Sequence, residues 1–357
     1  MAEIDDLFQA PPGGWPTKVR SVLDRNAGPA FRNASPLVTL PVLFLALLLV
    51  AGCGAPRGFT DSIAGVTVSH PVWMPDGWVY YLREVASEGP ELWRQPDTQD
   101  GGERVLGRQD IKGLCDGAYL LFLFRATNQE VGIATQCAGG TRTQLTAYSP
   151  QRTSFRPMAS TPFLGGVALA AGKATGYVEL PTACGTAIRP IRDGIIEEFA
   201  NPITVAGRSW KLSGAGPSDC GSFAWARSPA LGPDGSLFFL AAPDSIGKQP
   251  MTDPDALDQS QWYLCAWDGH RAAPRVVATL RGVADLTVSP DGRFVIAAVS
   301  TPGVGAISMV DTATGAKEEI VKGRQAYHPS LSPDGHRYVY AETLRHLRFG
   351  SLPGATS

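Results

Sequence analysis

Four segments of the chain share one pattern, in which a short apolar stretch leads into Pro-Asp-Gly and then into an apolar, β-rich run. These segments begin at His70, Ser228, Asp285 and His328. Pro fixes φ and starts a turn, Asp accepts hydrogen bonds from nearby amides, and Gly takes the φ > 0 position that a tight hairpin needs. Because two strands around such a turn cannot hide both faces, more strands must pack beside them. The repeat therefore predicts an all-β fold.

Two degenerate copies fill the gap between the first two clear turns. LCDGAYLLFLF has Cys115 in place of Pro, and FLGGVALAAG keeps only a Gly-Gly turn near Gly165. Neighbouring turns are then about 40 to 70 residues apart, a period typical of four-stranded propeller blades. We therefore expect six blades. The expected turn residues are Asp76, Gly77, Asp116, Gly117, Asp234, Gly235, Asp291, Gly292, Asp334 and Gly335.

The pattern resembles the SPDG-type repeats of TolB-like β-propellers, a WD-repeat-like arrangement, over residues 60–352. The hairpin around DTATG also resembles the repeat of YVTN-type propellers. The resemblance implies a ring of blades that strands from both chain ends close. The expected fold is an all-β, six-bladed propeller of four-stranded antiparallel blades over residues 54–357. We expect the segment FTDSIAGVTVS, from Phe59, to complete the last blade.

An export signal precedes the repeats. Residues 37–50 are uncharged and rich in Leu and Val, a run shorter than the ~20 residues of a membrane span but suited to a signal peptide. Arginines precede it, as the positive-inside rule requires. The small residues before Cys53 resemble a lipobox, which implies diacylglycerol on that thiol and cleavage before it. Residues 36–53 are thus predicted to be the signal, and the protein to be lipid-anchored on the extracytoplasmic face of a bacterial cell membrane.

Two features of this region leave alternatives open. Counting on to Ala55 gives almost enough apolar length for a tilted span, so an uncleaved signal anchor is the other interpretation. The leader, residues 1–35, begins acidic and is rich in Pro and Gly, whereas lipoprotein leaders are short and basic. Either the true start lies downstream, or a disordered tail precedes the signal.

The remaining cysteines predict disulfides, because export places them in an oxidising compartment. No CxxC spacing is present, which argues against a zinc site. Cys265 lies in the apolar run WYLCAW and is expected to be a buried thiol. The expected pairs are local ones, Cys115 with Cys137 and Cys184 with Cys220.

A polar residue recurs five positions before the turn Pro, at the start of the strand expected to line the axial channel. Asp285, His328 and His70 come from consecutive blades once the ring closes, so they are expected to meet near one channel mouth. Two imidazoles and a carboxylate are a possible set of divalent-metal ligands. The alternative is the polar lining of a wet channel. The candidate ring comprises His70, Asp110, Ser228, Asp285 and His328.

Signatures of enzymes are missing from the sequence: it has no GxSxG, no HExxH and no phosphate loop. A net charge of −2 and the lack of a basic stripe in the sequence argue against a function in nucleic-acid binding. We expect a monomeric, non-catalytic module without a cofactor that binds an envelope protein or peptide. One alternative is a small-ligand binder or metal-dependent enzyme using the axial channel. Another is a cell-wall glycan binder using the strand tryptophans, Trp73, Trp78, Trp93, Trp225, Trp262 and Trp267.

Overall fold

The computed structural model describes most of residues 66–353. The ranges outside the description are 1–65, 86–88, 98–100, 139–141, 163, 183–184, 198–202, 206–207, 211–225, 243–260, 270–273, 302–303, 324 and 354–357. Cys53, Cys184 and Cys220 therefore lie outside the described residues, as does the export signal. No helix in the described part of the chain has the length and apolar character needed to cross a bilayer.

Antiparallel sheets follow one another along the chain, and in each the strands are hydrogen-bonded in sequence order. The first sheet contains β1 (Val66–Trp73), β2 (Trp78–Val85), β3 (Gly89–Pro96) and β4 (Glu103–Leu106). A short helix, α3 (Arg108–Lys112), leads to the second sheet, β5 (Tyr119–Arg125), β6 (Val131–Gln136), β7 (Arg142–Ser149) and β8 (Ser154–Pro162). The third sheet contains β9 (Gly166–Leu169), β10 (Gly176–Thr182), β11 (Gly185–Arg192) and β12 (Ile195–Ile196).

The second half of the chain repeats this arrangement. A separate two-stranded pair, β13 (Ile203–Val205) and β14 (Arg208–Trp210), precedes it. The fourth sheet contains β15 (Ala226–Leu231), β16 (Leu237–Ala241), β17 (Gln261–Trp267) and β18 (Arg275–Arg281). The fifth contains β19 (Val283–Val288), β20 (Phe294–Thr301), β21 (Val304–Asp311) and β22 (Lys317–Val321), and the last contains β23 (Ala326–Leu331), β24 (Arg337–Glu342) and β25 (His346–Ser351).

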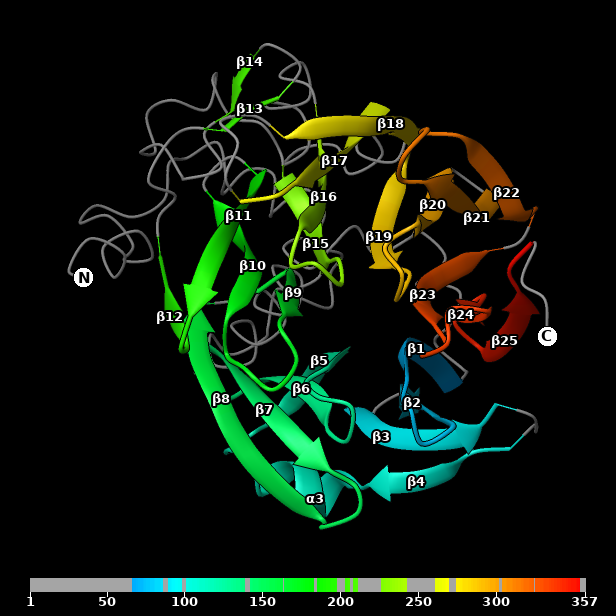
Figure 1. Cartoon of the computed structure of the whole chain (residues 1–357). Coiled ribbons are helices and arrows are strands. Elements are labelled where there is room, and N and C mark those ends of the chain that lie inside the picture. The colour runs from blue at the N-terminus through cyan, green and yellow to red at the C-terminus, as the bar shows by residue number, and fades with distance from the viewer. Residues whose placement is uncertain are drawn as a thin grey trace, which may run out of the picture. The chain divides into compact units, whose positions relative to one another are not determined.

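The first strands of the sheets form a closed ring. In order around it, β1 contacts β5, β5 contacts β9, β9 contacts β15, β15 contacts β19, β19 contacts β23, and β23 contacts β1 (Figure 1). The described residues therefore form a six-bladed β-propeller, which confirms the predicted fold. The inner strands surround an axial channel.

The ring closes differently from the expectation. Residues 66–69, predicted as an outer strand of the last blade, belong to β1, the innermost strand of the first blade. The Val68 N–H donates to the Leu344 carbonyl at 2.7 Å, which ties β1 to the last blade. The last blade has three strands within the described residues. The earlier part of the expected segment, residues 59–65, lies outside them.

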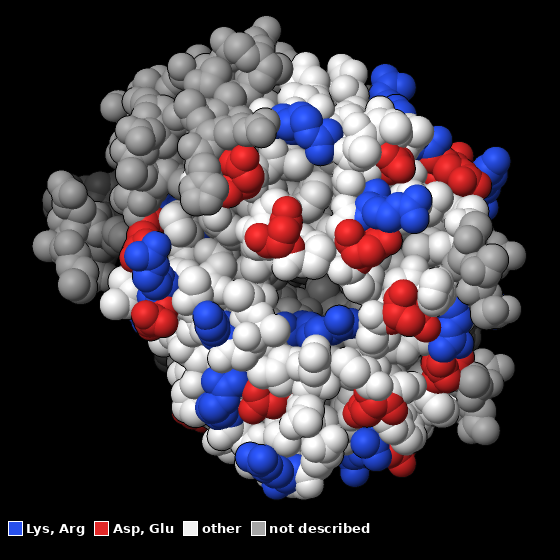
Figure 2. Space-filling model, viewed as in Figure 1, with Lys and Arg blue, Asp and Glu red and all other residues white. Residues whose placement is uncertain are grey.

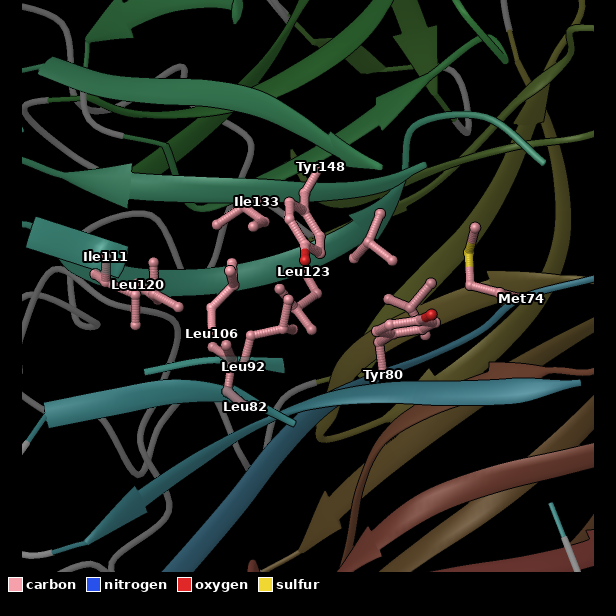
Figure 3. Close-up of a cluster of buried hydrophobic side chains, with 12 residues drawn as sticks. Met74, Tyr80, Leu82, Leu92, Leu106, Ile111, Leu120, Leu123, Ile133 and Tyr148 are labelled. Carbon is pink, nitrogen blue, oxygen red and sulfur yellow. The ribbon is translucent and has the colours of Figure 1, made fainter. Parts of the chain in front are cut away.

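Neighbouring blades pack through apolar faces. Between the first two blades, Leu82 and Leu92 face Leu120 and Ile133, and all four side chains are buried (Figure 3). Such burial contributes about 25 cal/mol per Å² of apolar surface removed from water. Because a blade hides its faces only against its neighbours, the blades hold the inner strands in place around the axis.

The Pro-Asp-Gly turns have the expected geometry. The Asp76 carboxylate accepts the Trp78 N–H at 3.1 Å, and the corresponding bonds of Asp234, Asp291 and Asp334 are each 3.0 Å long. The turn glycines all have positive φ, including +73° at Gly292. These carboxylate–amide bonds close the turn between the first and second strands of four blades.

The second and third blades do not use the turns that the degenerate repeats predicted. Asp116 and Gly117 precede β5, and the turn after this inner strand is residues 126–130, closed by the Ala126 N–H on the Glu130 carbonyl at 3.2 Å. In the third blade, Gly165 precedes β9 and the corresponding turn is residues 170–175. Both predicted turn positions were wrong because these turns lack Pro-Asp-Gly.

One disulfide joins Cys115 to Cys137, the first of the two expected pairs, with a Cα–Cα separation of 5.7 Å. It ties the segment before β5 to the end of β6. Cys265 is a free, buried thiol, as expected, and burial raises its pKa.

Glycine substitutions test the turns. An added Cβ at Gly335 would lie 3.1 Å from Cδ of Pro290 in the preceding blade, whereas at Gly235 it would meet nothing within 4 Å. Both residues have positive φ, which costs a side chain about 1–2 kcal/mol. Gly335→Ala should therefore lower the free energy of unfolding more than the control Gly235→Ala in urea titrations. Equal losses would show that contact between blades adds nothing at this turn.

Thiol mapping tests the cysteine assignment. Peptide mapping of the unreduced protein should recover Cys115 linked to Cys137, and Cys265 should react with an alkylating reagent only after denaturation, because its thiol is fully buried. Rapid labelling of Cys265 in the folded protein, or recovery of Cys115 as a free thiol, would contradict the structure.

Candidate ligand site in the axial channel

Strand pairing identifies the equivalent position in every inner strand. In each blade, the last residue of the inner strand pairs with the first or second residue of the next strand, as Trp73 does with Val79 and Arg125 with Val131. The residue three positions earlier is the one that the sequence placed in the axial ring. By this register the ring comprises His70, Phe122, Gly166, Ser228, Asp285 and His328.

Four of the five predicted ring residues occupy this position, and Asp110 does not. It lies in α3, before the inner strand of its blade, where its Oδ2 accepts the Gly107 N–H at 2.9 Å. The error came from aligning the second repeat on Cys115 instead of on the turn after β5. Phe122 takes the position, and its ring centroid lies 6.3 Å from that of His70.

His70, His328 and Asp285 do come together, as predicted. The two imidazoles stack, with centroids 3.9 Å apart and planes 27° apart. Nδ1 of His328 lies 3.0 Å from Oδ2 of Asp285. Stacked rings do not direct their nitrogens at a point between them, and the described residues contain no group of three or more His, Cys, Asp or Glu side chains arranged to hold a metal ion.

A buried carboxylate that the sequence did not suggest also reaches this cluster. Glu179 lies on β10 opposite Gly166, and its Oε2 accepts the Ser228 N–H at 2.7 Å. An added Cβ at Gly166 would lie 3.4 Å from Oε2, and one at Gly165 would lie 2.7 Å from Oε1. The two glycines therefore leave the space that the carboxylate fills. The only signal in the sequence was one acid in the apolar run YVELP, opposite a Gly-Gly pair.

Burial and neighbouring charges give the ionisable groups different pKa values. Burial raises the pKa of Glu179, although Arg227 and the Ser228 N–H partly offset that rise. Burial would also raise the pKa of Asp285, but the charge and hydrogen bond of His328, with the charges of His70 and Arg227, hold it below its usual range. Burial, helped by the charge of His328, lowers the pKa of His70 well below its usual value. At neutral pH, Asp285 is thus ionised and His70 is neutral.

The backbone is strained at three ring positions. His70, Ser228 and His328 have φ of 50°, 53° and 51° in the left-handed region that L side chains rarely adopt. The strand pairing shifts register at each of them. Strain of this kind clusters at functional sites. Nδ1 of His70 is buried and has no hydrogen-bond partner among the described residues. A bound water or a polar group of a ligand can satisfy such an atom.

Figure 2 shows that the ring of blades is hollowed at its centre, with charged side chains of both signs around the opening. The cluster thus combines a polar group of residues with a channel that opens to solvent. It can bind a ligand through imidazole, carboxylate and guanidinium groups.

None of the strand tryptophans in the described part of the chain is fully exposed, and Trp78, Trp93 and Trp267 are half-buried. Trp73 and Trp262 are fully buried. The guanidinium groups of Arg94 and Arg83 lie 4.2 Å from the ring centroids of Trp78 and Trp93, respectively. The large hydrophobic residues exposed there are Tyr119, Phe155 and Ile195, and Trp225 lies outside the described residues.

No protein-family model and no curated protein matches the sequence. Solved structures with a similar fold include TolB from Acinetobacter baumannii, 14% identical, with a TM-score of 0.49 over 81% of this chain and 62% of that chain. The β-propeller domain of the Trilobed protease from Pyrococcus furiosus is 14% identical, with a TM-score of 0.47 over 81% of this chain and 82% of that one. An oligogalacturonate lyase in complex with manganese is 10% identical, with a TM-score of 0.46 over 81% and 78%. These similarities transfer no activity to this chain, which spans 62% of the length of the TolB chain.

The two carboxylates predict pH effects of opposite sign. The pKa of Glu179 is raised on folding, so its contribution to stability is complete below the unfolded value of about 4.3 and is lost as pH rises through the folded pKa. The stability of Glu179→Gln relative to wild type should therefore increase with pH. Asp285 has a lowered pKa, so its contribution is present above about 3.9 and is lost as pH falls through the folded pKa.

Urea unfolding of wild type, Glu179→Gln and Asp285→Asn between pH 3 and 8 measures both effects. Wild type should begin to lose its advantage over Asp285→Asn below about pH 4, while Glu179→Gln should gain on wild type towards neutral pH. If both variants follow wild type in parallel across this range, the electrostatic description of the site is wrong.

Proposed function

We propose that this protein is a non-catalytic binding module of the bacterial cell envelope that takes up a peptide segment of another envelope protein through its axial channel. The observation that carries the proposal is the strained ring: His70, Ser228 and His328, from three blades, hold left-handed backbone conformations, with two stacked imidazoles and a backbone N–H bonded to the Glu179 carboxylate. Each such conformation costs about 1–2 kcal/mol. A channel lined only for solvation does not need this arrangement.

The chemistry of the ring favours a peptide. The Asp285 carboxylate can accept N–H groups, an imidazole N–H of His328 can donate to a carbonyl, and Phe122 offers an apolar surface beside His70. A polypeptide presents these same groups in turn along its length. The stacking of the imidazoles favours binding over metal-dependent catalysis, because their nitrogens do not converge on one ion.

The envelope location rests on the sequence signal at Cys53. If that signal operates, the mature protein begins with a diacylglyceryl-modified Cys53, and Cys53→Ala abolishes both lipidation and the cleavage that depends on it. Mass spectrometry of the membrane-extracted protein measures the first residue and its modification. Recovery of residues 37–50 in the mature wild-type protein would contradict this assignment and favour a signal anchor.

Peptide selection tests the binding function. Peptides selected from a displayed library on the purified exported domain should bind wild type in calorimetry and should lose at least about tenfold in affinity to His328→Gln and to Asp285→Asn. His346→Gln is the control, because His346 is an exposed residue of β25 and is not one of the ring residues. Melting curves confirm that each variant is folded. Selected peptides that bind the ring variants as tightly as the control would overturn the proposal.

A further inference from the structure

Arg125 is an arginine without an acidic partner at the end of an inner strand. It is the last residue of β5 and is half-buried, and its Nη2 donates to the Trp73 carbonyl of the neighbouring blade at 2.5 Å. No carboxylate lies within ion-pair distance of its guanidinium among the described residues. One of its five N–H donors is accounted for by the bond to Trp73.

Four other arginines of the propeller differ in this respect. Each has a carboxylate beside it, and the pairs are Arg94 with Glu103, Arg156 with Glu130, Arg337 with Asp97, and Arg348 with Glu342. Burial lowers the pKa of Arg125, and no acidic neighbour counters that change. A partly buried charge without a counter-ion costs free energy, which a bound anion would offset.

The position of Arg125 places that charge beside the channel. Arg125 ends β5, one of the six inner strands that form the ring around the axis. Its bond to the Trp73 carbonyl joins it to the end of β1, the neighbouring inner strand. Arg125 lies three residues beyond Phe122 along β5, about 10 Å nearer the turn end of the channel. The acid closest to Trp73 in sequence, Asp76, already accepts the Trp78 N–H and the Tyr80 hydroxyl.

We propose that Arg125 anchors an anionic group, a carboxylate or a phosphate, of the ligand that enters the channel. This inference rests on the proposed peptide-binding function, and for a peptide the matching groups are a free C-terminal carboxylate, an acidic side chain and a phosphorylated residue. A planar guanidinium pairs with either anion through two parallel hydrogen bonds. The ring cluster then contacts the part of the ligand that lies deeper in the channel.

The competing explanation is that Arg125 only ties the first two blades together through the Trp73 carbonyl. Two variants separate the explanations. Arg125→Gln keeps a donor for that carbonyl but removes the charge, and Arg125→Lys keeps the charge but removes the planar pair of donors. Arg275→Gln is the control for general salt effects, since Arg275 is an exposed residue at the start of the outer strand β18.

The first measurement titrates the exported domain with acetate and with inorganic phosphate at constant ionic strength and follows the melting temperature. A bound anion raises it in a saturable way. Wild type and Arg275→Gln should saturate with at least one of the two anions, Arg125→Gln should bind at least about tenfold more weakly, and Arg125→Lys should fall between them. The anion whose effect on the melting temperature saturates at the lower concentration shows whether the site prefers a carboxylate or a phosphate. No saturation in wild type, or equal saturation in Arg125→Gln, would overturn the anchor.

The second measurement distinguishes a failure of the Arg125 anchor from a failure of the proposed peptide-binding function. Channel-binding peptides with a carboxylate or a phosphate should lose at least about tenfold in affinity when that group is amidated or removed, and the loss should vanish in Arg125→Gln. If peptides bind through the ring but neither change matters, the anchor is wrong and the peptide-binding function stands. If the free anions bind through Arg125 and no peptide does, the anchor stands and the peptide-binding function is wrong.

Discussion

The bond from the turn aspartate to the backbone amide two residues on is the interaction on which the propeller depends. In four blades it closes the turn between the first and second strands at nearly the same length. Ser289 and Ser332 strengthen two of these turns, since each hydroxyl donates to the turn aspartate and accepts an N–H of the following strand. A turn closed in this way sets the register of its hairpin, and that register decides which side chain reaches the axis.

Packing between blades arranges these hairpins in a ring. An added Cβ at Gly292 would lie 3.2 Å from Pro233, and one at Gly335 would lie 3.1 Å from Pro290, so each of these turns packs closely on the one before it. Apolar faces such as those of Leu82 and Ile133 hold the sheets together farther out. The inner strands can then hold three left-handed residues and a buried carboxylate at the axis, because the surrounding blades offset their cost.

The channel that results has two chemically different levels. In the ring, Asp285 is ionised beside His328. The Glu179 carboxylate accepts the Ser228 N–H and fills the space that Gly166 leaves because it has no side chain. Nearer the turns, Arg125 presents a positive charge with no acid beside it in the described residues. A ligand with an anionic group and a polar chain would match both levels at once, which is why we propose a peptide and not an isolated ion as the ligand.

The sequence by itself determined the blades whose turns carry Pro-Asp-Gly, the closeness of His70, Asp285 and His328, and the pairing of Cys115 with Cys137. The turns depend on chemistry that acts over a few residues and can be read from the chain. The shared register of the repeats places His70, Asp285 and His328 at the same position of consecutive blades, and the local spacing of Cys115 and Cys137, 22 residues apart, favours their pairing. Only the tertiary structure decided that Phe122 replaces Asp110, that Glu179 enters the cluster and that Arg125 lies without an acid at the channel. Those outcomes depend on the hairpin register in blades without the Pro-Asp-Gly signal, and on the space that a glycine of one strand leaves for a side chain of the next. Both are set by packing between strands that no local pattern encodes.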